Sequence, residues 1–295
     1  MIDLHNHILP GLDDGAADVS VAIGMAKMAV EEGTTVLACT PHILPGLYHN
    51  RGDLIRREVA KLQQVLTRQG IPLNLVIGAD VHLVPDLSAG LREGRLLTLA
   101  DSRYVLIEPP RHVYPARLAE ALFSLIVAGY VPILTHPERL AWINTHYAEI
   151  LRLFHGGVWM QITAASLLGK FGKPARYWSE RMLDEGRVHI LASDAHDLTR
   201  RPVNLRAGRD AAALRVGEEE AEHMVSTRPE GILANEPPSA LPMPLGGARG
   251  EKSNETGYCD GRVESIPATS RAGRRGTIGS APLGNTIGRL RQLFG

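Results

Sequence analysis

Residues 1–15 of the chain read MIDLHNHILPGLDDG, an apolar run that ends in two histidines and is followed by two aspartates. In an extended strand alternate side chains point to the same face, so His5 and His7 are expected to face the same way. Two imidazoles on one face of a strand make a poor core and a good pair of metal ligands. The alternative is a polar strand end whose histidines lie in solvent. The rest of the chain decides between the two.

The same pattern, a strand-like run followed by polar residues, recurs along residues 1–235. Strand-like runs alternate there with amphipathic, helix-like stretches, several of which end at a glycine. This alternation predicts a parallel sheet, because parallel neighbours need a crossover between them. Six or seven such units predict a closed or nearly closed (β/α) barrel. The expected strands are IDLHNH (2–7), TTVLACTPH (34–42), LNLVIGADVH (73–82), RYVLIEPP (103–110), YVPILTHPER (130–139), VWMQITAAS (158–166) and RVHILASDAH (187–196).

Nearly every expected strand carries an ionisable residue at its C-terminal end. Barrel enzymes build their active sites on that rim, from the ends of several strands. We therefore expect these side chains to converge on one mouth. Unrelated polar residues in separate loops would not fall so consistently at strand ends. The residues concerned are His5, His7, His42, Asp80, Glu108, His136, Asp194 and His196.

The composition limits the class of protein. The chain has 295 residues, 44% of them apolar, and a formal net charge of zero, which is typical of a soluble globular protein. This balance does not indicate nucleic acid or an anionic membrane as the main partner. No apolar run approaches the roughly 20 residues of a membrane span, and the first residues lack the features of a signal peptide. Because Cys39 and Cys259 give no disulfide framework, we expect a cytoplasmic location.

The character of the sequence changes near residue 236. Beyond that point the chain is rich in Pro, Gly, Ser and Arg and has no apolar periodicity. Such segments bury too little apolar surface to offset the entropy of ordering. We therefore expect residues 1–235 to form the folded domain and residues 236–295 to form a disordered tail.

The rim residues are a mixture of imidazoles and carboxylates without a thiolate. Such a set suits Zn, Mn, Fe or Co better than Ca, and the lack of cysteine argues against a closed structural zinc site. One ion takes about four to six ligands, so eight or nine on one rim imply two or three ions that share carboxylates. Neighbouring metal ions are the usual device for phosphoester hydrolysis, because they activate a water and hold the phosphoryl oxygens.

Arginines follow two of the rim histidines. Arg139 lies just past His136 in HPER, and Arg200 and Arg201 lie just past His196 in SDAHDLTRRP. A guanidinium fork is suited to the oxygens of a phosphate. A rim salt bridge is the commoner role of a loop arginine, but positions beside metal ligands favour phosphate binding. The chain has no P-loop, and neither of its cysteines lies in a phosphate-binding loop.

Several motifs together resemble a known family. DLHNH, DDG, TPH, IEPP, THPER and SDAH…RP resemble the PHP (polymerase and histidinol phosphatase) superfamily. GLDDG, DSRYVLIE and HPER are more specifically similar to the manganese-dependent tyrosine-protein phosphatases of bacterial capsule and exopolysaccharide loci, the CpsB/YwqE type. The similarity extends over about residues 1–235. It implies a distorted, TIM-like (β/α)7 barrel with three metal ions, Mn²⁺ before Fe, Zn, Co or Mg.

The resemblance also implies roles for individual residues. Arg139 and Arg201 would contact the substrate phosphate, and with His42 they are the predicted catalytic residues. Asp13 is the alternative to its neighbour Asp14 as a ligand. The implied metal ligands are His5, His7, Asp14, His42, Asp80, Glu108, His136, Asp194 and His196, and His82, which alternates with Asp80 on a strand, is expected close behind them.

The substrate implied by the resemblance is a phosphotyrosine protein, namely the C-terminal tail of a cognate bacterial tyrosine kinase. The enzyme would thereby regulate capsular or exopolysaccharide biosynthesis. No nucleic-acid partner and no membrane span are expected, and assembly into a homo-oligomer is left open. The alternative is a small-molecule phosphoesterase such as a histidinol-phosphate phosphatase. The loops ILPGLYHNRGD (43–53) and EPPRHVYPAR (108–117) would set a mouth open to a protein or closed around a small molecule.

One departure from the family pattern concerns Asp80. The family usually has glutamate in the corresponding GAE segment, whereas this chain has GAD. Aspartate is one methylene shorter, so a carboxylate that bridges two ions would reach less far. A weakly active, kinase-binding regulator with an impaired metal centre is therefore a further alternative.

Overall fold

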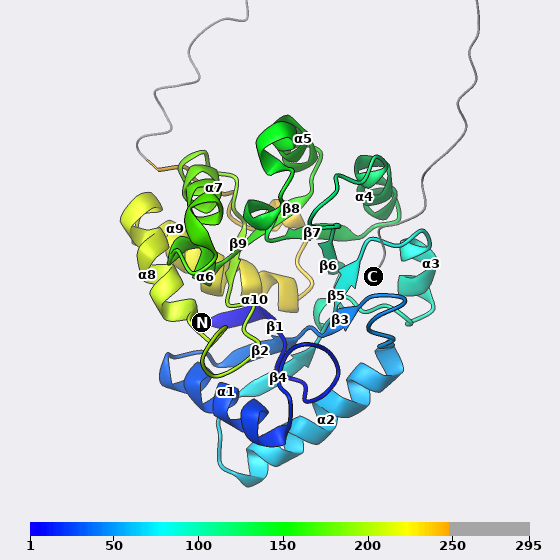
Figure 1. The fold of residues 1–295 in the computed structure, drawn as a ribbon, viewed down its shortest axis with the longest axis vertical. Helices are drawn as coiled ribbons and strands as arrows, with labels where there is room; N and C mark the ends of the chain where they lie inside the picture. Colours follow the sequence, from blue (N-terminus) through cyan, green and yellow to red (C-terminus); the bar gives the residue numbers. More distant parts are fainter. Residues whose placement is uncertain (248–295) are drawn as a thin grey trace, which may run out of the picture. The chain divides into compact units, whose positions relative to one another are not determined.

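The computed structural model describes residues 1–247, and every pair of named strands in this part of the chain is parallel. Each strand overlaps one of the runs that the sequence predicts, and helices connect most of the consecutive strands (Figure 1). The strands are β1 (Ile2–Asn6), β2 (Val36–Cys39), β3 (His42–Ile43), β4 (Asn74–Ile77), β5 (Asp80–His82), β6 (Tyr104–Glu108), β7 (Val131–Thr135), β8 (Trp159–Thr163) and β9 (Ile190–Ala192).

Two positions of the barrel are occupied by interrupted strands. Only Thr40 and Pro41 separate β2 from β3, and only Gly78 and Ala79 separate β4 from β5. Pro41 has no N–H to donate, so the ladder breaks there. Strands pair in the orders β1-β2-β4 and β3-β5-β6-β7-β8-β9, and joining the two interrupted strands gives seven barrel positions.

The ring of strands closes between β9 and β1. The N–H of His7 donates to the carbonyl of Ala195 at 3.0 Å, and the N–H of Asp194 donates to the carbonyl of His5 at 2.9 Å. Asn6 and Ala195 form a parallel bridge at the same place. The closed ring of seven parallel units confirms the predicted TIM-like (β/α)7 barrel.

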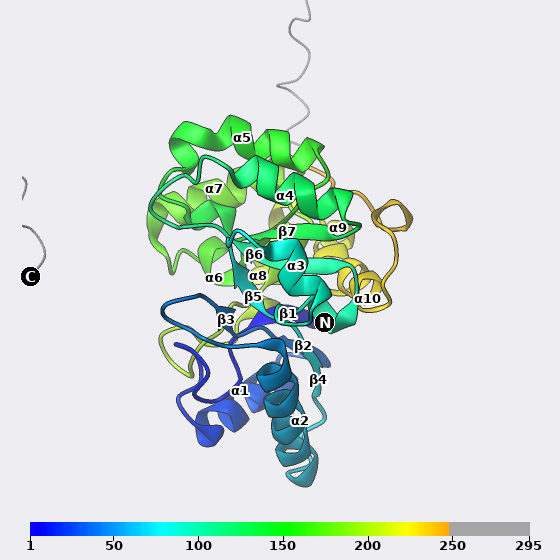
Figure 2. The same cartoon turned by 90° about the vertical axis from the view of Figure 1, so that its right-hand side faces the viewer.

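Helices surround the strands, as the two perpendicular views show (Figure 2). In α2, the apolar residues Ile55, Val59, Leu62 and Leu66 recur at helical spacing and are buried, which places one face of the helix on the barrel. The helices are α1 (Val19–Glu31), α2 (Gly52–Arg68), α3 (Leu87–Arg92), α4 (Leu118–Val127), α5 (Ile143–His155), α6 (Ala164–Leu167), α7 (Gly172–Asp184), α8 (Leu205–Val216), α9 (Glu218–Glu222) and α10 (Arg228–Leu233), with short turns η1 (Leu99–Asp101), η2 (Pro137–Arg139), η3 (His223–Thr227) and η4 (Pro238–Ala240).

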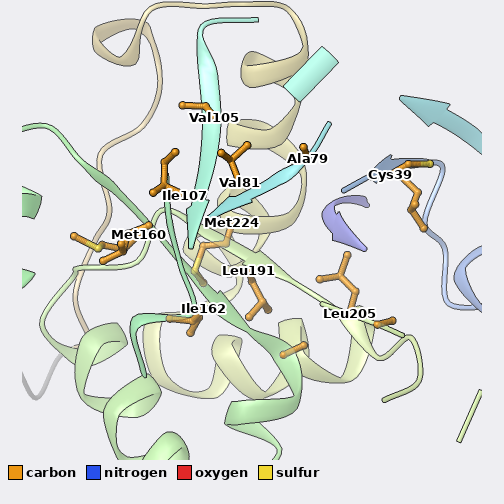
Figure 3. Packing of buried hydrophobic residues seen from close by; sticks show 14 of the residues in the cluster. Cys39, Ala79, Val81, Val105, Ile107, Met160, Ile162, Leu191, Leu205 and Met224 are labelled. Carbon is orange, nitrogen blue, oxygen red and sulfur yellow. The ribbon is translucent and has the colours of Figure 1, made fainter. Parts of the chain in front are cut away.

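Two layers of apolar side chains hold the barrel together. The outer layer lies between the strands and the helices and includes Val105 and Ile107 of β6 (Figure 3). The residues that alternate with them, Tyr104 and Leu106, face the barrel interior. This inner layer also contains Ile2, Leu4, Ile133, Trp159, Ile190 and Ile232. Alternate residues of a strand such as β6 therefore pack in two different cores, one on each face of the sheet.

The inner layer is closed at the amino-terminal ends of the strands by α10. Ile232 of α10 is fully buried among the first residues of several strands. The buried guanidinium of Arg228 holds α10 in place through an ion pair with Glu220 at 2.8 Å and a hydrogen bond to the carbonyl of His189 at 3.2 Å. The carboxyl-terminal ends of the strands are left for polar residues.

Residues 236–247, which the sequence assigned to a disordered tail, follow a defined path along the barrel. The hydroxyl of Tyr104 donates to the carbonyl of Glu236 at 2.8 Å, and Nε of Arg228 donates to the carbonyl of Pro242 at 2.7 Å. The rest of the expected tail, 248–295 with Cys259, lies outside the described residues. Within 1–247, no helix is long and apolar enough to cross a membrane.

We expect Ile232→Ala to lower the free energy of unfolding by about 2–4 kcal/mol, because it leaves a cavity under the barrel. Leu214→Ala is the matched control: Leu214 is 91% exposed on α8, so this change should alter stability by no more than about 0.5 kcal/mol. Urea denaturation followed by circular dichroism measures both. Equal effects of the two variants would contradict the role of Ile232 as an inner-core residue.

Candidate metal centre

A bulge in β1 turns His5, and with it His7 just beyond the strand, into the barrel. Three steps along β1, from Asp3 to Asn6, match only two along β2. Such a bulge lets two successive residues face the same side. Leu4 belongs to the inner core, and the next residue, His5, also faces inward, with Nδ1 2.8 Å from Oε1 of Gln161. Alternation places the two histidines on one face, and the bulge makes that face the inner one.

The predicted rim residues meet at the carboxyl-terminal ends of the strands. Their ligand atoms form four overlapping groups, within each of which all atoms lie within 4.8 Å of one another. Asp194 joins them with Oδ1 3.5 Å from Nε2 of His7 and 3.6 Å from Nε2 of His5. The four groups are His7–Asp14–His42–His196, His5–His7–Asp80, Asp80–Glu108–His136 and His42–His82–Glu108. The structure thus brings together all nine residues for which a ligand role was predicted.

Four residues belong to two groups each: His7, His42, Asp80 and Glu108. Groups that share members are what two or three neighbouring ions with common ligands require. The shorter side chain of Asp80 still reaches the middle of the cluster, because its Oδ2 lies 3.3 Å from Nδ1 of His42 and 3.5 Å from Nε2 of His5. Asp80 therefore has the position of a bridging carboxylate.

The chemistry of the cluster fits divalent cations. Five of its polar atoms are buried without a hydrogen-bond partner among the described residues, and burial without a partner is costly. Directed lone pairs on nitrogen and oxygen around a common point match the preferences of Mn²⁺, Fe²⁺ and Zn²⁺. The unpartnered atoms are Oδ1 and Oδ2 of Asp80, Oε2 of Glu108, Nδ1 of His136 and Nε2 of His196.

Charge is unevenly distributed among the histidines. Burial alone would lower the pKa of His5 and of His42, but nearby carboxylates, Asp80 foremost, together more than offset it and raise both pKa values to about 9. Burial lowers the pKa of His136 well below its ordinary value and that of His196 to about 4. The metal-free cluster therefore holds protons on His5 and His42, with which a metal ion must compete.

The structure separates the two neighbouring aspartates. Oδ2 of Asp13 lies 2.7 Å from Nδ1 of His7 and accepts the N–H of His42 at 2.9 Å. A carboxylate behind an imidazole in this way fixes the ring and directs its other nitrogen forward. Oδ1 of Asp14 lies 3.5 Å from Nε2 of both His42 and His196. Asp14 thus lies within the cluster, whereas Asp13 lies behind His7 and fixes the orientation of its ring.

Arg139 and Arg201 meet at the edge of the cluster. Both donate to Oδ2 of Asp194, Arg201 at 2.7 Å, and the guanidinium of Arg139 lies 4.1 Å from the ring centroid of Phe171. Nε of each arginine is buried without a hydrogen-bond partner among the described residues. The structure therefore gives both arginines the salt bridge considered as an alternative, and Asp194 engages only part of the five N–H donors that each guanidinium carries.

Two further residues belong to the site. Nε2 of His82 lies 2.8 Å from Oε2 of Glu108 and 3.2 Å from Nδ1 of His42, so His82 is within the cluster and not merely behind it. The sequence analysis missed Arg111, whose pKa is lowered by burial and by the neighbouring Arg139 and Arg201. Its signal was available, because Arg111 follows the end of β6 as Arg139 follows the end of β7.

Two strand ends have unusual backbone conformations. His136 and Asp194 have φ values of 34° and 50°, in the left-handed region that non-glycine residues rarely adopt. Each costs on the order of 1 kcal/mol or more and persists only where the surroundings enforce it. Here the strained turns at the ends of β7 and β9 bring both side chains to the cluster, which is typical of a functional site.

A closed parallel barrel with a histidine and carboxylate cluster at the carboxyl-terminal rim defines a metal-dependent barrel enzyme. The chain belongs to the CpsB/CapC family of capsular polysaccharide synthesis, whose family model matches residues 1–234. The tyrosine-protein phosphatase YwqE of Bacillus subtilis is 33% identical over 236 residues, which cover 80% of this chain and 92% of YwqE. CapC of Staphylococcus aureus is 35% identical, with the same coverage.

A solved structure is similar as well. It comes from work on YwqE from Bacillus subtilis and CpsB from Streptococcus pneumoniae, described as unique metal-dependent tyrosine phosphatases. It matches with a TM-score of 0.77 and 32% identity, over 83% of this chain and 99% of that one. The fold and the family inferred from the sequence motifs are thereby confirmed.

We expect Asp13→Asn to weaken metal binding about 10–100-fold, because it removes the charge that orients His7. Asp210→Asn, on the exposed side of α8, is the control for loss of one negative charge. Manganese titration followed by isothermal calorimetry measures the affinity, and elemental analysis after dialysis measures the retained metal. Unchanged affinity in Asp13→Asn would show that Asp13 does not support the centre.

The pKa values predict a pH dependence of the metal-free protein. Because folding raises the pKa of His5 and His42 from 6.5 to about 9, their stabilising contribution is fully present below pH 6.5 and is lost as pH rises through about 9. The melting temperature of the metal-free protein should fall over this range. Manganese should flatten that slope, because the ion replaces the protons. A melting temperature that falls equally with pH in the presence and in the absence of manganese would contradict this.

Proposed function

We propose that this CpsB/CapC family member removes phosphate from the C-terminal tyrosine-rich tail of a cognate bacterial tyrosine kinase, with Mn²⁺ as its metal, and so regulates polysaccharide biosynthesis. By its family the chain is a metal-dependent tyrosine-protein phosphatase, a phosphoric monoester hydrolase. The observation that supports the proposal most is the overlap of the four ligand groups beside two arginines with spare donors.

The metal would be held by the nitrogen and oxygen donors at the strand ends. Bound ions would supply an activated water and neutralise charge on the phosphoryl oxygens. The mixed imidazole and carboxylate donors are compatible with manganese, which the similarity of the motifs to manganese-dependent phosphatases favours as the resident metal. The residues proposed as ligands are His5, His7, Asp14, His42, Asp80, Glu108, His136, Asp194 and His196.

Arg139 and Arg201 would bind the phosphoryl group. Asp194 and Phe171 hold their guanidinium groups in place, so little reorganisation is needed when a phosphate arrives. Each guanidinium has five N–H donors, and those that Asp194 does not accept would be available to the phosphate. Arg111 would add a third positive charge that attracts a dianionic phosphate to the same edge. His42, which belongs to two ligand groups, is the proposed catalytic histidine.

The openness of the centre supports a protein substrate. The side chain of Asp14 is 48% exposed and that of Arg201 is 25% exposed, so both the metal ligands and the phosphate donors can be reached from solvent. A phosphotyrosine on a flexible protein tail can enter such a mouth. The position of Asp80 in two ligand groups opposes the alternative of an impaired regulator.

The deciding experiment compares two substrates in the presence of manganese. We expect kcat/KM for a phosphotyrosine peptide from the kinase tail to exceed that for histidinol phosphate by at least about tenfold. His136→Ala, which removes a proposed ligand, should abolish turnover of both. Phosphate release measures the rates.

Each outcome has a separate meaning. Preference for histidinol phosphate would assign the chain to small-molecule metabolism and refute the peptide substrate. No turnover of either substrate with metal bound would favour the regulator and refute the enzyme. Turnover of the peptide that survives in His136→Ala would refute the metal centre as the site of reaction.

A further inference from the structure

A cavity of about 480 Å³ lies beside the metal centre, between two loops. One loop, 43–51, starts at the last residue of β3, directly after His42, and the other, 84–86, follows β5. Most of the surface that lines the cavity is apolar. The apolar lining residues are Ile43, Pro45, Tyr48, Val84, Pro85 and Leu96.

The cavity and the metal centre share a wall. The ring of Tyr48, which lines the cavity, stacks on the ring of His42 with a centroid distance of 5.6 Å and an angle of 15°. Asn50, also in the lining, donates from Nδ2 to the carbonyls of His42 and Leu12, each at 2.9 Å. These contacts tie the 43–51 loop to a proposed ligand. A substrate in the centre therefore lies next to the cavity.

The two arginines at the cavity edge, Arg51 and Arg95, are already paired within the chain. Arg51 pairs with Asp53 at 3.7 Å, and Arg95 pairs with Glu93 at 2.6 Å. The arginine charges are therefore locally balanced, and the remaining charge, the exposed carboxylate of Asp86, would not attract an acidic ligand. The apolar lining instead favours burial of an apolar side chain, which gains free energy in proportion to the area removed from water.

We propose that this cavity is a subsite for an aliphatic or aromatic side chain of the protein substrate, one to three residues from the phosphotyrosine. The inference rests on the proposed phosphotyrosine substrate and adds a recognition element to it. An extended peptide advances about 3.3 Å per residue, so such a side chain is within roughly 10 Å of the phosphotyrosine. The volume of about 480 Å³ is larger than one leucine or phenylalanine side chain requires.

This subsite acts on substrate selection and not on the chemical step. The residues that line it do not belong to the ligand groups or to the arginine edge. A small phosphate ester has no part that reaches the cavity, so it gains nothing from it. A peptide with a matching side chain gains binding energy there, which raises kcat/KM for the peptide alone.

The test uses three substrates with the manganese-loaded full chain. They are free phosphotyrosine and two phosphotyrosine peptides that carry either leucine or alanine at the three positions on each side. Val84→Trp fills the cavity from the 84–86 loop, and Pro45→Trp fills it from the exposed rim of the 43–51 loop. Val127→Trp is the matched control, because Val127 is 72% exposed on α4 and does not line the cavity. Thermal melting verifies that each variant folds.

We expect wild type to prefer the leucine peptide over the alanine peptide by about tenfold in kcat/KM, through KM. Val84→Trp and Pro45→Trp should reduce that ratio to near one, and Val127→Trp should retain it. Absence of the preference in wild type, or its persistence in both filled variants, would overturn the subsite while leaving the phosphatase assignment intact. Failure of wild type to hydrolyse free phosphotyrosine and both peptides would overturn the proposed function itself.

Discussion

The junction between β9 and β1 is the constraint on which the rest of the structure depends. Two backbone hydrogen bonds, from His7 to Ala195 and from Asp194 to His5, join the first strand to the last and close the barrel. The same two bonds place the amino-terminal histidines beside Asp194, about 190 residues later in the chain. The contacts that close the barrel therefore also bring the metal centre together, and neither half of the barrel contains the centre by itself.

Asp194 shows how the fold distributes buried charge. Burial alone would raise its pKa, but Arg201, His5 and Arg139 hold it well below the ordinary value. One oxygen faces the histidines and the other receives the arginines, so a single carboxylate connects the proposed metal ligands with the proposed phosphate donors. The left-handed backbone at this residue is the local strain that the arrangement requires.

The interruption of the second barrel strand places a proposed metal ligand, His42, beside the proposed peptide subsite. The break at Pro41 ends β2, restarts the chain as β3 at His42 and sends it into the 43–51 loop. His42 then faces the ligand cluster while Tyr48 of the loop stacks on it and lines the neighbouring cavity. A change in this loop would therefore alter peptide selection through contacts that end on a proposed ligand. This arrangement is common in barrel enzymes, whose loops vary on a constant ring of strands.

The sequence by itself indicated six or seven parallel units, placed His5 and His7 on one face and located the candidate ligands at strand ends, because strand periodicity and chain order are local properties. Only the tertiary structure decided that the face shared by the two histidines is the inner one, which of Asp13 and Asp14 faces the cluster, that His82 joins it and Arg111 lies near its edge, and that residues 236–247 stay on the barrel. Those outcomes depend on a bulge, on the cross-strand pairing of His82 with Glu108 and on packing between distant segments. No local pattern encodes such contacts, since each is settled only when the barrel closes.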